Sequence, residues 1–255
     1  FREGRFLAAL LVGNFVLVPL AVWGLSRFLP RDPAILLGTL MVLLVPCTDW
    51  FITFAQLGRG DARLAIAATP INLLAQIVLL PAYLWLFAGD AFAGAVEPRR
   101  FLGAFLGLIL LPLLLAAVTQ RWAERRPGRH RWRDQIDRTP VPLLAVVVFL
   151  IAASQAGTVV HSLHALGRVA IVFVAYLVLA AYLGLATAKI FRLPPPATRT
   201  LIFSLGTRNS FVVLPFALAL PAGWDAATVV IVLQSLVELF GMIGYLWWVP
   251  HRLAP

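Results

Sequence analysis

Apolar runs long enough to cross a lipid bilayer dominate this sequence and restrict what it can fold into. Eight runs approach the roughly 20 residues that a helix needs to span the hydrocarbon core. They lie near residues 6–28, 34–57, 64–88, 100–120, 140–160, 167–190, 199–220 and 226–249. Hydrophobic residues make up 61% of the chain, above the roughly 45–50% of soluble domains. We therefore expect an all-α integral membrane protein in which residues 1–255 form one transmembrane domain.

The basic residues between these runs predict how the chain is oriented in the membrane. The 121–138 loop carries seven arginines, and short loops rich in Lys and Arg stay on the cytoplasmic side. If the spans alternate from that loop, the cytoplasmic segments hold 15 Lys and Arg residues and the opposite segments hold 5, with only Arg208 inside a span. The net charge of +10 then reflects topology rather than nucleic-acid binding. We predict a multi-pass protein of the cell membrane, with both ends of this chain in the cytoplasm and the lipid bilayer as its partner.

The second run is interrupted near its centre by Pro46-Cys47-Thr48-Asp49. A proline removes a backbone donor and displaces a carbonyl, so the helix is expected to break there. A carboxylate such as that of Asp49 is rare inside a span unless it faces a cavity or a partner. Cys47 is the only cysteine, which excludes an intramolecular disulfide. We interpret the segment as half of a transport site; the alternative for Cys47 is a small side chain packed in the core.

The polar residues of spans two and three recur in spans seven and eight. In the first half, Asn72 follows Cys47 of the pair Cys47-Thr48 by 25 residues, and Gln76 lies four residues further on. In the second half, Gln234 follows Asn209 of the pair Asn209-Ser210 by 25 residues, and Glu238 lies four residues further on. An odd number of spans separates the equivalent helices, so they enter the membrane from opposite sides. Inverted repeats with interrupted helices that meet near the midplane are typical of secondary transporters.

The charged residues inside the spans are candidates for ion coupling. Asp49 and Arg208 belong to the two interrupted helices, and a mutual ion pair would lower the cost of burying them. The pair is either a structural bridge, or Asp49 carries a proton while Arg208 supplies a fixed positive charge in place of a coupling cation. Glu238 is a second candidate proton carrier, and a hydrogen-bonded packing role is the alternative.

The neutral polar residues of the same spans are candidate ligands for a small solute. They are Thr48, Asn72, Gln76, Asn209, Ser210 and Gln234, of which Gln76 and Gln234 would take part in ion coupling with Asp49 and Glu238. For each of them singly, holding helices together is the alternative role. The Cys47 thiolate suits a soft acceptor such as trivalent arsenic. The sequence indicates no cofactor and does not predict an oligomeric state.

Three stretches together resemble the arsenite-efflux permeases of the bile acid/arsenite/riboflavin transporter superfamily. They are Val45-Pro46-Cys47-Thr48-Asp49-Trp50, Leu57-Gly58-Arg59-Gly60-Asp61 with Asn72 and Gln76, and Gly206-Thr207-Arg208-Asn209-Ser210-Phe211 with Leu236-Val237-Glu238. The resemblance implies a ten-helix fold of two inverted repeats, whose two broken helices cross around 46–49 and 206–210. The eight spans would then be helices three to ten of an N-terminally truncated chain, which agrees with Phe1 as its first residue.

The resemblance also implies the function. It points to export of trivalent arsenic or antimony by an antiporter that the proton motive force drives, with Cys47 as a transient arsenic ligand. The sequence departs from the family at three positions: Val212 replaces a glutamate, and Asp49 and Arg208 replace small or apolar residues. These changes affect the expected coupling mechanism.

Three other functions are alternatives to arsenite export. The first is a sodium- or proton-coupled symporter of bile acid-like organic anions, with Arg208 on the substrate carboxylate, although an arginine at the crossing repels Na⁺. The second is a membrane-embedded hydrolase, and the sequence has no Glu-Glu pair, His-Glu-x-x-His or Gly-x-Ser-x-Gly motif to support one. A passive scaffold or sensor does not require two interrupted helices. We expect a transporter and not an enzyme.

Overall fold

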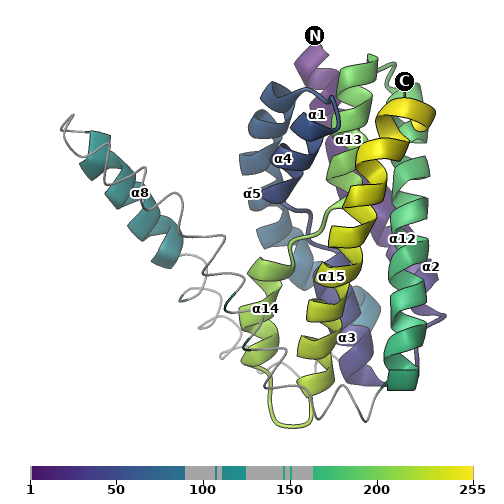
Figure 1. Cartoon of the computed structure of the whole chain (residues 1–255). Coiled ribbons are helices and arrows are strands. Elements are labelled where there is room, and N and C mark those ends of the chain that lie inside the picture. The colour runs from purple at the N-terminus through teal and green to yellow at the C-terminus, as the bar shows by residue number, and fades with distance from the viewer. Residues whose placement is uncertain are drawn as a thin grey trace.

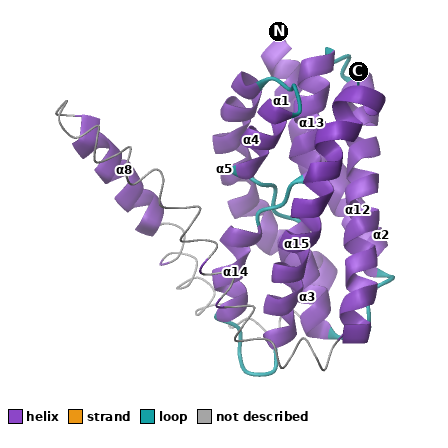
Figure 2. Ribbon diagram, viewed as in Figure 1, coloured by secondary structure: helices purple, strands orange, loops and turns teal. Residues whose placement is uncertain are grey.

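The computed structural model describes residues 2–89, 107, 111–124, 146, 150 and 163–254, and these form helices joined by short loops (Figure 2). The all-helical prediction is confirmed for this part of the chain. Four helices in it are long and apolar enough to cross a membrane: Glu3–Ser26, Ala62–Ala88, Ala165–Ile190 and Asp225–Leu253.

The long helices contain the following elements. The first combines α1 (Arg2–Val12), a π-helical turn η1 (Gly13–Leu17) and α2 (Val18–Ser26). The others are α5 (Ala62–Ala88), α12 (Leu163–Ile190) and α15 (Asp225–Trp248), which the π-helical turn η4 (Val249–Leu253) extends.

Two further segments are pairs of half-helices. The first pair is α3 (Pro33–Leu43) and α4 (Trp50–Leu57), and the second is α13 (Pro195–Gly206) and α14 (Ser210–Leu218). The non-helical residues between the members of each pair lie where the sequence predicts interruptions. A helix that stops inside an apolar segment leaves backbone groups unpaired, so each break must find partners elsewhere.

Most of the predicted spans near 100–120 and 140–160 lies outside the described residues. The longest described part is α8 (Leu111–Glu124), which covers the end of the first of these spans and the start of the arginine-rich loop.

Local sequence signals fix where two of the helices begin. The Asp32 carboxylate accepts hydrogen bonds from the backbone N–H groups of Ala34 and Ile35 at 2.8 and 3.3 Å, and Pro33 occupies the first turn of α3. Asp61 caps α5 in the same way. An aspartate at this position satisfies N–H groups that have no partner within the helix.

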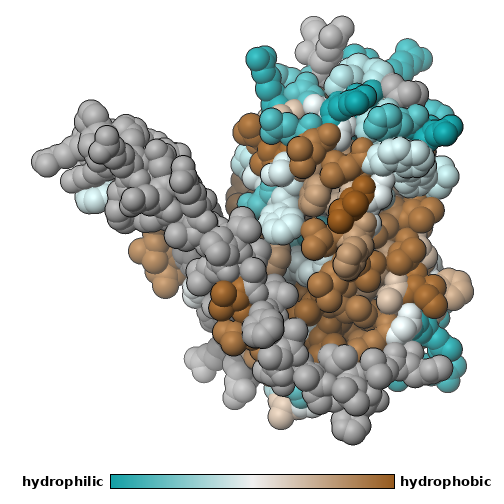
Figure 3. All heavy atoms as spheres, in the orientation of Figure 1, coloured by the Kyte–Doolittle hydropathy of each residue, from teal (hydrophilic) through white to brown (hydrophobic). Residues whose placement is uncertain are grey.

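The helices of the two halves run in opposite directions. In Figure 1, α1–α2 and α5 run away from the end that holds both termini, whereas α12 and α15 run towards it. The pair α3–α4 likewise runs opposite to α13–α14. On the face drawn in Figure 3, hydrophilic residues gather at the end with the termini, and hydrophobic residues cover much of the surface below it. Such a distribution suits a protein embedded in a bilayer.

Close helix packing holds the two halves together. α3 packs against α15, and α4 packs against α13. At Gly38 the two backbones nearly touch, because a Cβ atom there would lie 2.6 Å from the carbonyl oxygen of Ala227. Only glycine permits this approach of α3 to α15.

Candidate functional site

The two helix breaks meet and satisfy each other's backbone groups. Pro46 and Arg208 form an antiparallel bridge. On either side of it, the Cys47 N–H donates to the Thr207 carbonyl at 3.2 Å and the Asn209 N–H donates to the Val45 carbonyl at 2.8 Å. These bonds pair backbone groups that the interrupted helices leave free, so the crossing is part of the hydrogen-bonded framework.

Each residue of the first break corresponds to a residue of the second break, and the number of positions between the two, their offset, is the same for every pair. Val45 corresponds to Thr207, Pro46 to Arg208 and Cys47 to Asn209, and the partners in each hydrogen bond exchange roles. The same offset relates the polar residues of α5 to those of α15.

A second pair of hydrogen bonds, away from the crossing, follows the same offset. The Tyr83 hydroxyl donates to the Phe15 carbonyl, and the Tyr245 hydroxyl donates to the Leu177 carbonyl. The elements α1–α5 therefore repeat the arrangement of α12–α15 in the opposite direction (Figure 1).

Four half-helix ends surround the crossing. α3 and α13 end there with carbonyl groups that have no partner in their own helix, whereas α4 and α14 begin there with N–H groups that have no partner in their own helix. The helix dipoles make the ends of α3 and α13 partially negative and the starts of α4 and α14 partially positive.

The Arg208 guanidinium lies at the negative ends. It is 2% exposed. Its Nη2 donates to the Ser204 and Leu205 carbonyls at 2.7 and 2.9 Å and to Asn14 Oδ1 at 2.8 Å, and its Nη1 donates to the Leu43 carbonyl at 3.3 Å. The guanidinium is thus enclosed by the hydrogen-bonded framework of the crossing.

Asp49 and Arg208 do not form the ion pair expected from the sequence. Within the described residues no bridge joins them, because the arginine donates to the oxygens around Leu43 and Ser204 instead. Asp49 is exposed at the start of α4, and its carboxylate makes no capping bond to that helix. Among the described residues, the hydrogen-bond partners of the guanidinium are helix-end carbonyls and Asn14 Oδ1, not a carboxylate.

Asn209 and Thr48 connect the two breaks through their side chains. Asn209 Nδ2 donates to Thr48 Oγ1 at 3.2 Å, while Asn209 Oδ1 accepts from the Val212 N–H and caps α14. The Thr69 hydroxyl of α5 donates to the Thr48 carbonyl, which attaches α5 to the crossing. Ser210, the first residue of α14, is buried beside them.

Cys47 is buried at the crossing, 4% exposed, at the position equivalent to Asn209. The backbone N–H groups of Asp49 and Phe51 lie against its sulfur at the start of α4. Among the described residues, no group of three His, Cys, Asp or Glu side chains is placed to hold a metal ion. A soft acceptor at Cys47 would therefore have one protein sulfur and otherwise oxygen or nitrogen ligands.

Glu238 and Gln234 lie against the second break. The Glu238 carboxylate is half-buried and accepts from the Arg208 backbone N–H at 2.8 Å and from Gln234 Nε2 at 2.7 Å. Gln234 Oε1 is buried without a partner in the described structure. The arrangement leaves the second carboxylate oxygen of Glu238 available for a proton or a ligand.

Asn72 and Gln76 are the buried polar residues with the least satisfied hydrogen bonds. They are 0% and 3% exposed, and within the described residues none of their four amide nitrogen and oxygen atoms has a partner. Both lie on the buried face of α5, which also includes Ala65 and Ala68. Asn72 lies about one turn after Thr69, whose hydroxyl donates to the Thr48 carbonyl at the crossing. Buried amides are nearly always hydrogen-bonded, so these two are candidates to bind a solute, an ion or water.

Sequence reasoning missed two residues around Arg208, Asn14 and Tyr176. Asn14 is buried in η1 and also donates to the Ser204 hydroxyl at 3.0 Å. Tyr176 places its ring 5.7 Å from the guanidinium and donates to the Leu205 carbonyl. Asn14 and Tyr176 are related by the same offset as Cys47 and Asn209, so extending the repeat to the first and sixth spans would have found them.

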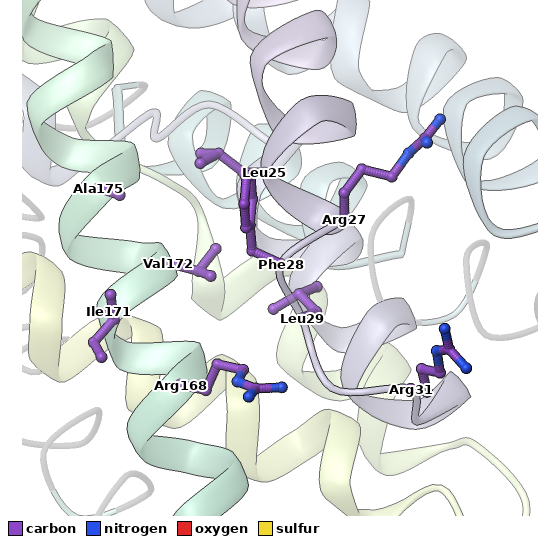
Figure 4. A pocket seen from close by; sticks show the side chains of 9 residues that line it. All are labelled: Leu25, Arg27, Phe28, Leu29, Arg31, Arg168, Ile171, Val172 and Ala175. Carbon is purple, nitrogen blue, oxygen red and sulfur yellow. The ribbon is translucent and has the colours of Figure 1, made fainter.

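A separate surface cavity of about 790 Å³ lies between the end of α2 and α12. Its wall is apolar, and three arginines border it: Arg27, Arg31 and Arg168. In Figure 4, Arg27 points away from α12, whereas Arg168 extends from α12 towards the loop. None of the residues predicted as a solute site lines this cavity.

Broken helices that cross at a polar centre, in two halves of opposite direction, define the class of secondary membrane transporters. Residues 1–162 match the Sodium Bile acid symporter family, and the chain belongs to this family.

Two curated relatives are sodium/bile acid cotransporter 5 of Rattus norvegicus and of Mus musculus. The chain is 26% identical to the rat protein over 206 residues, which are 80% of this chain and 46% of that protein. It is 25% identical to the mouse protein over 204 residues, 79% of this chain and 46% of that protein. The chain therefore spans about half the length of these relatives. The expected superfamily is confirmed, and these matches favour the organic-anion alternative over arsenite export.

Proposed function

We propose that this chain forms the core of a secondary transporter that carries a small organic anion across the cell membrane. The observation that carries the proposal is the crossing itself, where the positive ends of α4 and α14 meet at a polar centre and α4 begins without a side-chain cap. In secondary transporters such positive half-helix ends bind anionic groups of the substrate. The similarity to sodium/bile acid cotransporter 5 supports an amphipathic carboxylate or sulfonate as the solute.

In this proposal the solute binds between the crossing and α5. Thr48, Asn209 and Ser210 line the breaks, and Asn72 and Gln76 supply amide groups that have no other partner among the described residues. A bound anion would accept hydrogen bonds from the two amide nitrogens and from the half-helix ends. This removes the cost of burying those amides unpaired, which is about 1–3 kcal/mol for each group.

Proton transfer would involve Glu238, with Asp49 as a second candidate. Glu238 lies beside the unpaired Gln234 oxygen and accepts the Arg208 N–H, so its protonation would change the hydrogen bonds at the break. Asp49 is exposed at the start of α4, where it can exchange protons with water.

The proposed topology places both ends of this chain in the cytoplasm, within a ten-helix, two-repeat domain. Its support is the excess of Lys and Arg on one set of loops together with the opposite directions of α1–α5 and α12–α15.

The proposal is tested with the purified full-length protein in liposomes, using taurocholate as the probe anion. We expect saturable uptake that Gln76→Ala reduces strongly, while Gln56→Ala, an exposed glutamine of α4, leaves uptake unchanged. Absence of uptake by a folded wild-type protein, or equal uptake by both variants, would count against the proposed site.

Arsenite remains a second candidate solute because the Cys47 sulfur lies at the start of α4, inside the crossing. Arsenite flux in the same liposomes, abolished by Cys47→Ser, would support that candidate. The organic-anion proposal instead expects Cys47→Ser to transport taurocholate at the wild-type rate, because a hydroxyl has nearly the same shape.

A further inference from the structure

Four oxygen atoms converge on the Arg208 guanidinium. Three are main-chain carbonyl oxygens, of Leu43 at the end of α3 and of Ser204 and Leu205 in the last turn of α13, and the fourth is Asn14 Oδ1. Three of the four distances lie between 2.7 and 2.9 Å, and the fourth is 3.3 Å. The group is 2% exposed and has no carboxylate among these partners.

An all-oxygen set of this kind is suited to a bound cation. The carbonyl ends of α3 and α13 carry the negative ends of two helix dipoles. In secondary transporters, unwound backbone carbonyls and half-helix C-terminal ends coordinate Na⁺. Here the cation among the oxygen atoms is the guanidinium of Arg208, which is covalently attached to the chain.

The position is charged in only one of the two halves. Pro46 occupies the place equivalent to Arg208 and supplies neither a charge nor an N–H group. The positive charge is therefore a specific feature of the second break and not a requirement of the repeated backbone.

We propose that Arg208 is a tethered cation that takes the place of a coupling Na⁺ at the crossing, so that the protein works without Na⁺ at this position. The part of this statement that concerns transport rests on the proposed function, whereas the occupancy of the cation position does not. A Na⁺ ion cannot share these oxygens with the guanidinium, because two like charges at contact distance repel each other in a poorly hydrated site. The driving ion must then be another one, such as H⁺.

A purely structural role for Arg208 makes a different prediction for the variant Arg208→Gln. Glutamine removes the charge and leaves the Leu43, Ser204, Leu205 and Asn14 oxygens without a cation. If the oxygens form a cation position, Na⁺ will enter it and stabilise the variant. If Arg208 only holds helices together, the variant will be destabilised to the same extent in every salt.

The experiment measures the melting temperature of the purified full-length protein in detergent, in NaCl and in choline chloride at equal ionic strength. Four proteins are compared: wild type, Arg208→Gln, Arg208→Lys and the control Arg63→Gln, which changes an exposed arginine of α5. This readout needs no solute, so it remains decisive even if the proposed organic anion is wrong.

We expect Arg208→Gln to melt below wild type in choline and to recover by about 4 °C in NaCl at ten times the dissociation constant, with a saturable dependence. For wild type, Arg208→Lys and Arg63→Gln, the melting temperature of each protein should be the same in NaCl as in choline chloride. A saturable Na⁺ stabilisation of wild type, or a folded Arg208→Gln that ignores Na⁺, would overturn the proposal. If Arg208→Gln does not fold, wild type and Arg208→Lys decide: insensitivity to Na⁺ in both supports the proposal, and a saturable response in either one overturns it.

Discussion

Pro46 and Arg208 face each other in an antiparallel bridge, and they occupy equivalent positions in the two halves of the structure. Proline has no N–H group, whereas the Arg208 N–H donates to the Glu238 carboxylate at 2.8 Å. One break therefore anchors an acidic side chain through its backbone, and the other has no donor at that point. This difference between two otherwise matched halves places Arg208 and Glu238 on the side of α13, α14 and α15.

Asn14 should stabilise the buried guanidinium of Arg208. Asn14→Leu removes the Oδ1 acceptor of the guanidinium and the donor to the Ser204 hydroxyl, and we expect a loss of about 2 kcal/mol in stability because a buried charged donor is left unpaired. Asn14→Asp keeps the acceptor and should be tolerated much better. Thermal unfolding in detergent checks both variants, and equal melting temperatures for Leu and Asp would contradict the assigned contact.

The paired tyrosines test whether the two halves are equivalent. Tyr83→Phe and Tyr245→Phe each remove one hydrogen bond to a main-chain carbonyl, so each should cost about 1 kcal/mol. Tyr182 is 52% exposed, and Tyr182→Phe serves as the matched control with no expected loss. A loss in only one of the two paired variants would show that the halves are not energetically alike.

The contact of α3 with α15 should depend on Gly38. Gly38→Ala places a methyl group 2.6 Å from the Ala227 carbonyl oxygen, and separating the helices should cost about 1–3 kcal/mol. Gly244→Ala, on α15 with nothing within 4 Å of the added carbon, should be neutral or slightly stabilising. The comparison uses melting temperatures of the two variants, and an unaffected Gly38→Ala protein would refute the close packing of these helices.

Glu238 should determine how uptake responds to a proton gradient. Glu238→Gln retains an oxygen that accepts the Arg208 N–H but cannot exchange a proton, so we expect a folded protein whose taurocholate uptake no longer responds to an inward proton gradient. Asp225→Asn, in the first turn of the same helix, is the control and should respond as wild type does. An unchanged response in Glu238→Gln would assign proton transfer to a different group, with Asp49 the next to test.

Sequence patterns predicted the positions of the breaks well and the side-chain partners poorly. Pro46 and the polar run from Thr207 interrupt apolar segments, and a helix cannot continue in hydrocarbon without backbone partners, so the interruptions follow from composition. The partner of Arg208 does not follow in this way. Opposite charges suggested Asp49, but the oxygens that receive the guanidinium are mainly backbone carbonyls, which every residue carries and no sequence pattern reveals.

The repeat was visible in the sequence only where polar residues mark it. Cys47 and Asn209, with the residues that follow at equal steps, revealed it because polar side chains are few in these spans. Phe15 and Leu177 take part through their carbonyl groups, so their side chains give no sign of the equivalence that the structure reveals.

The most direct test of this account is taurocholate uptake by the wild-type full-length protein in liposomes, with a proton gradient present and NaCl replaced by choline chloride. Saturable uptake of equal rate in both salts is the expected result, because the anion would bind at the crossing while Arg208 occupies the cation position. Uptake that requires Na⁺ would contradict the role of Arg208, and arsenite flux without any taurocholate uptake would contradict the proposed solute.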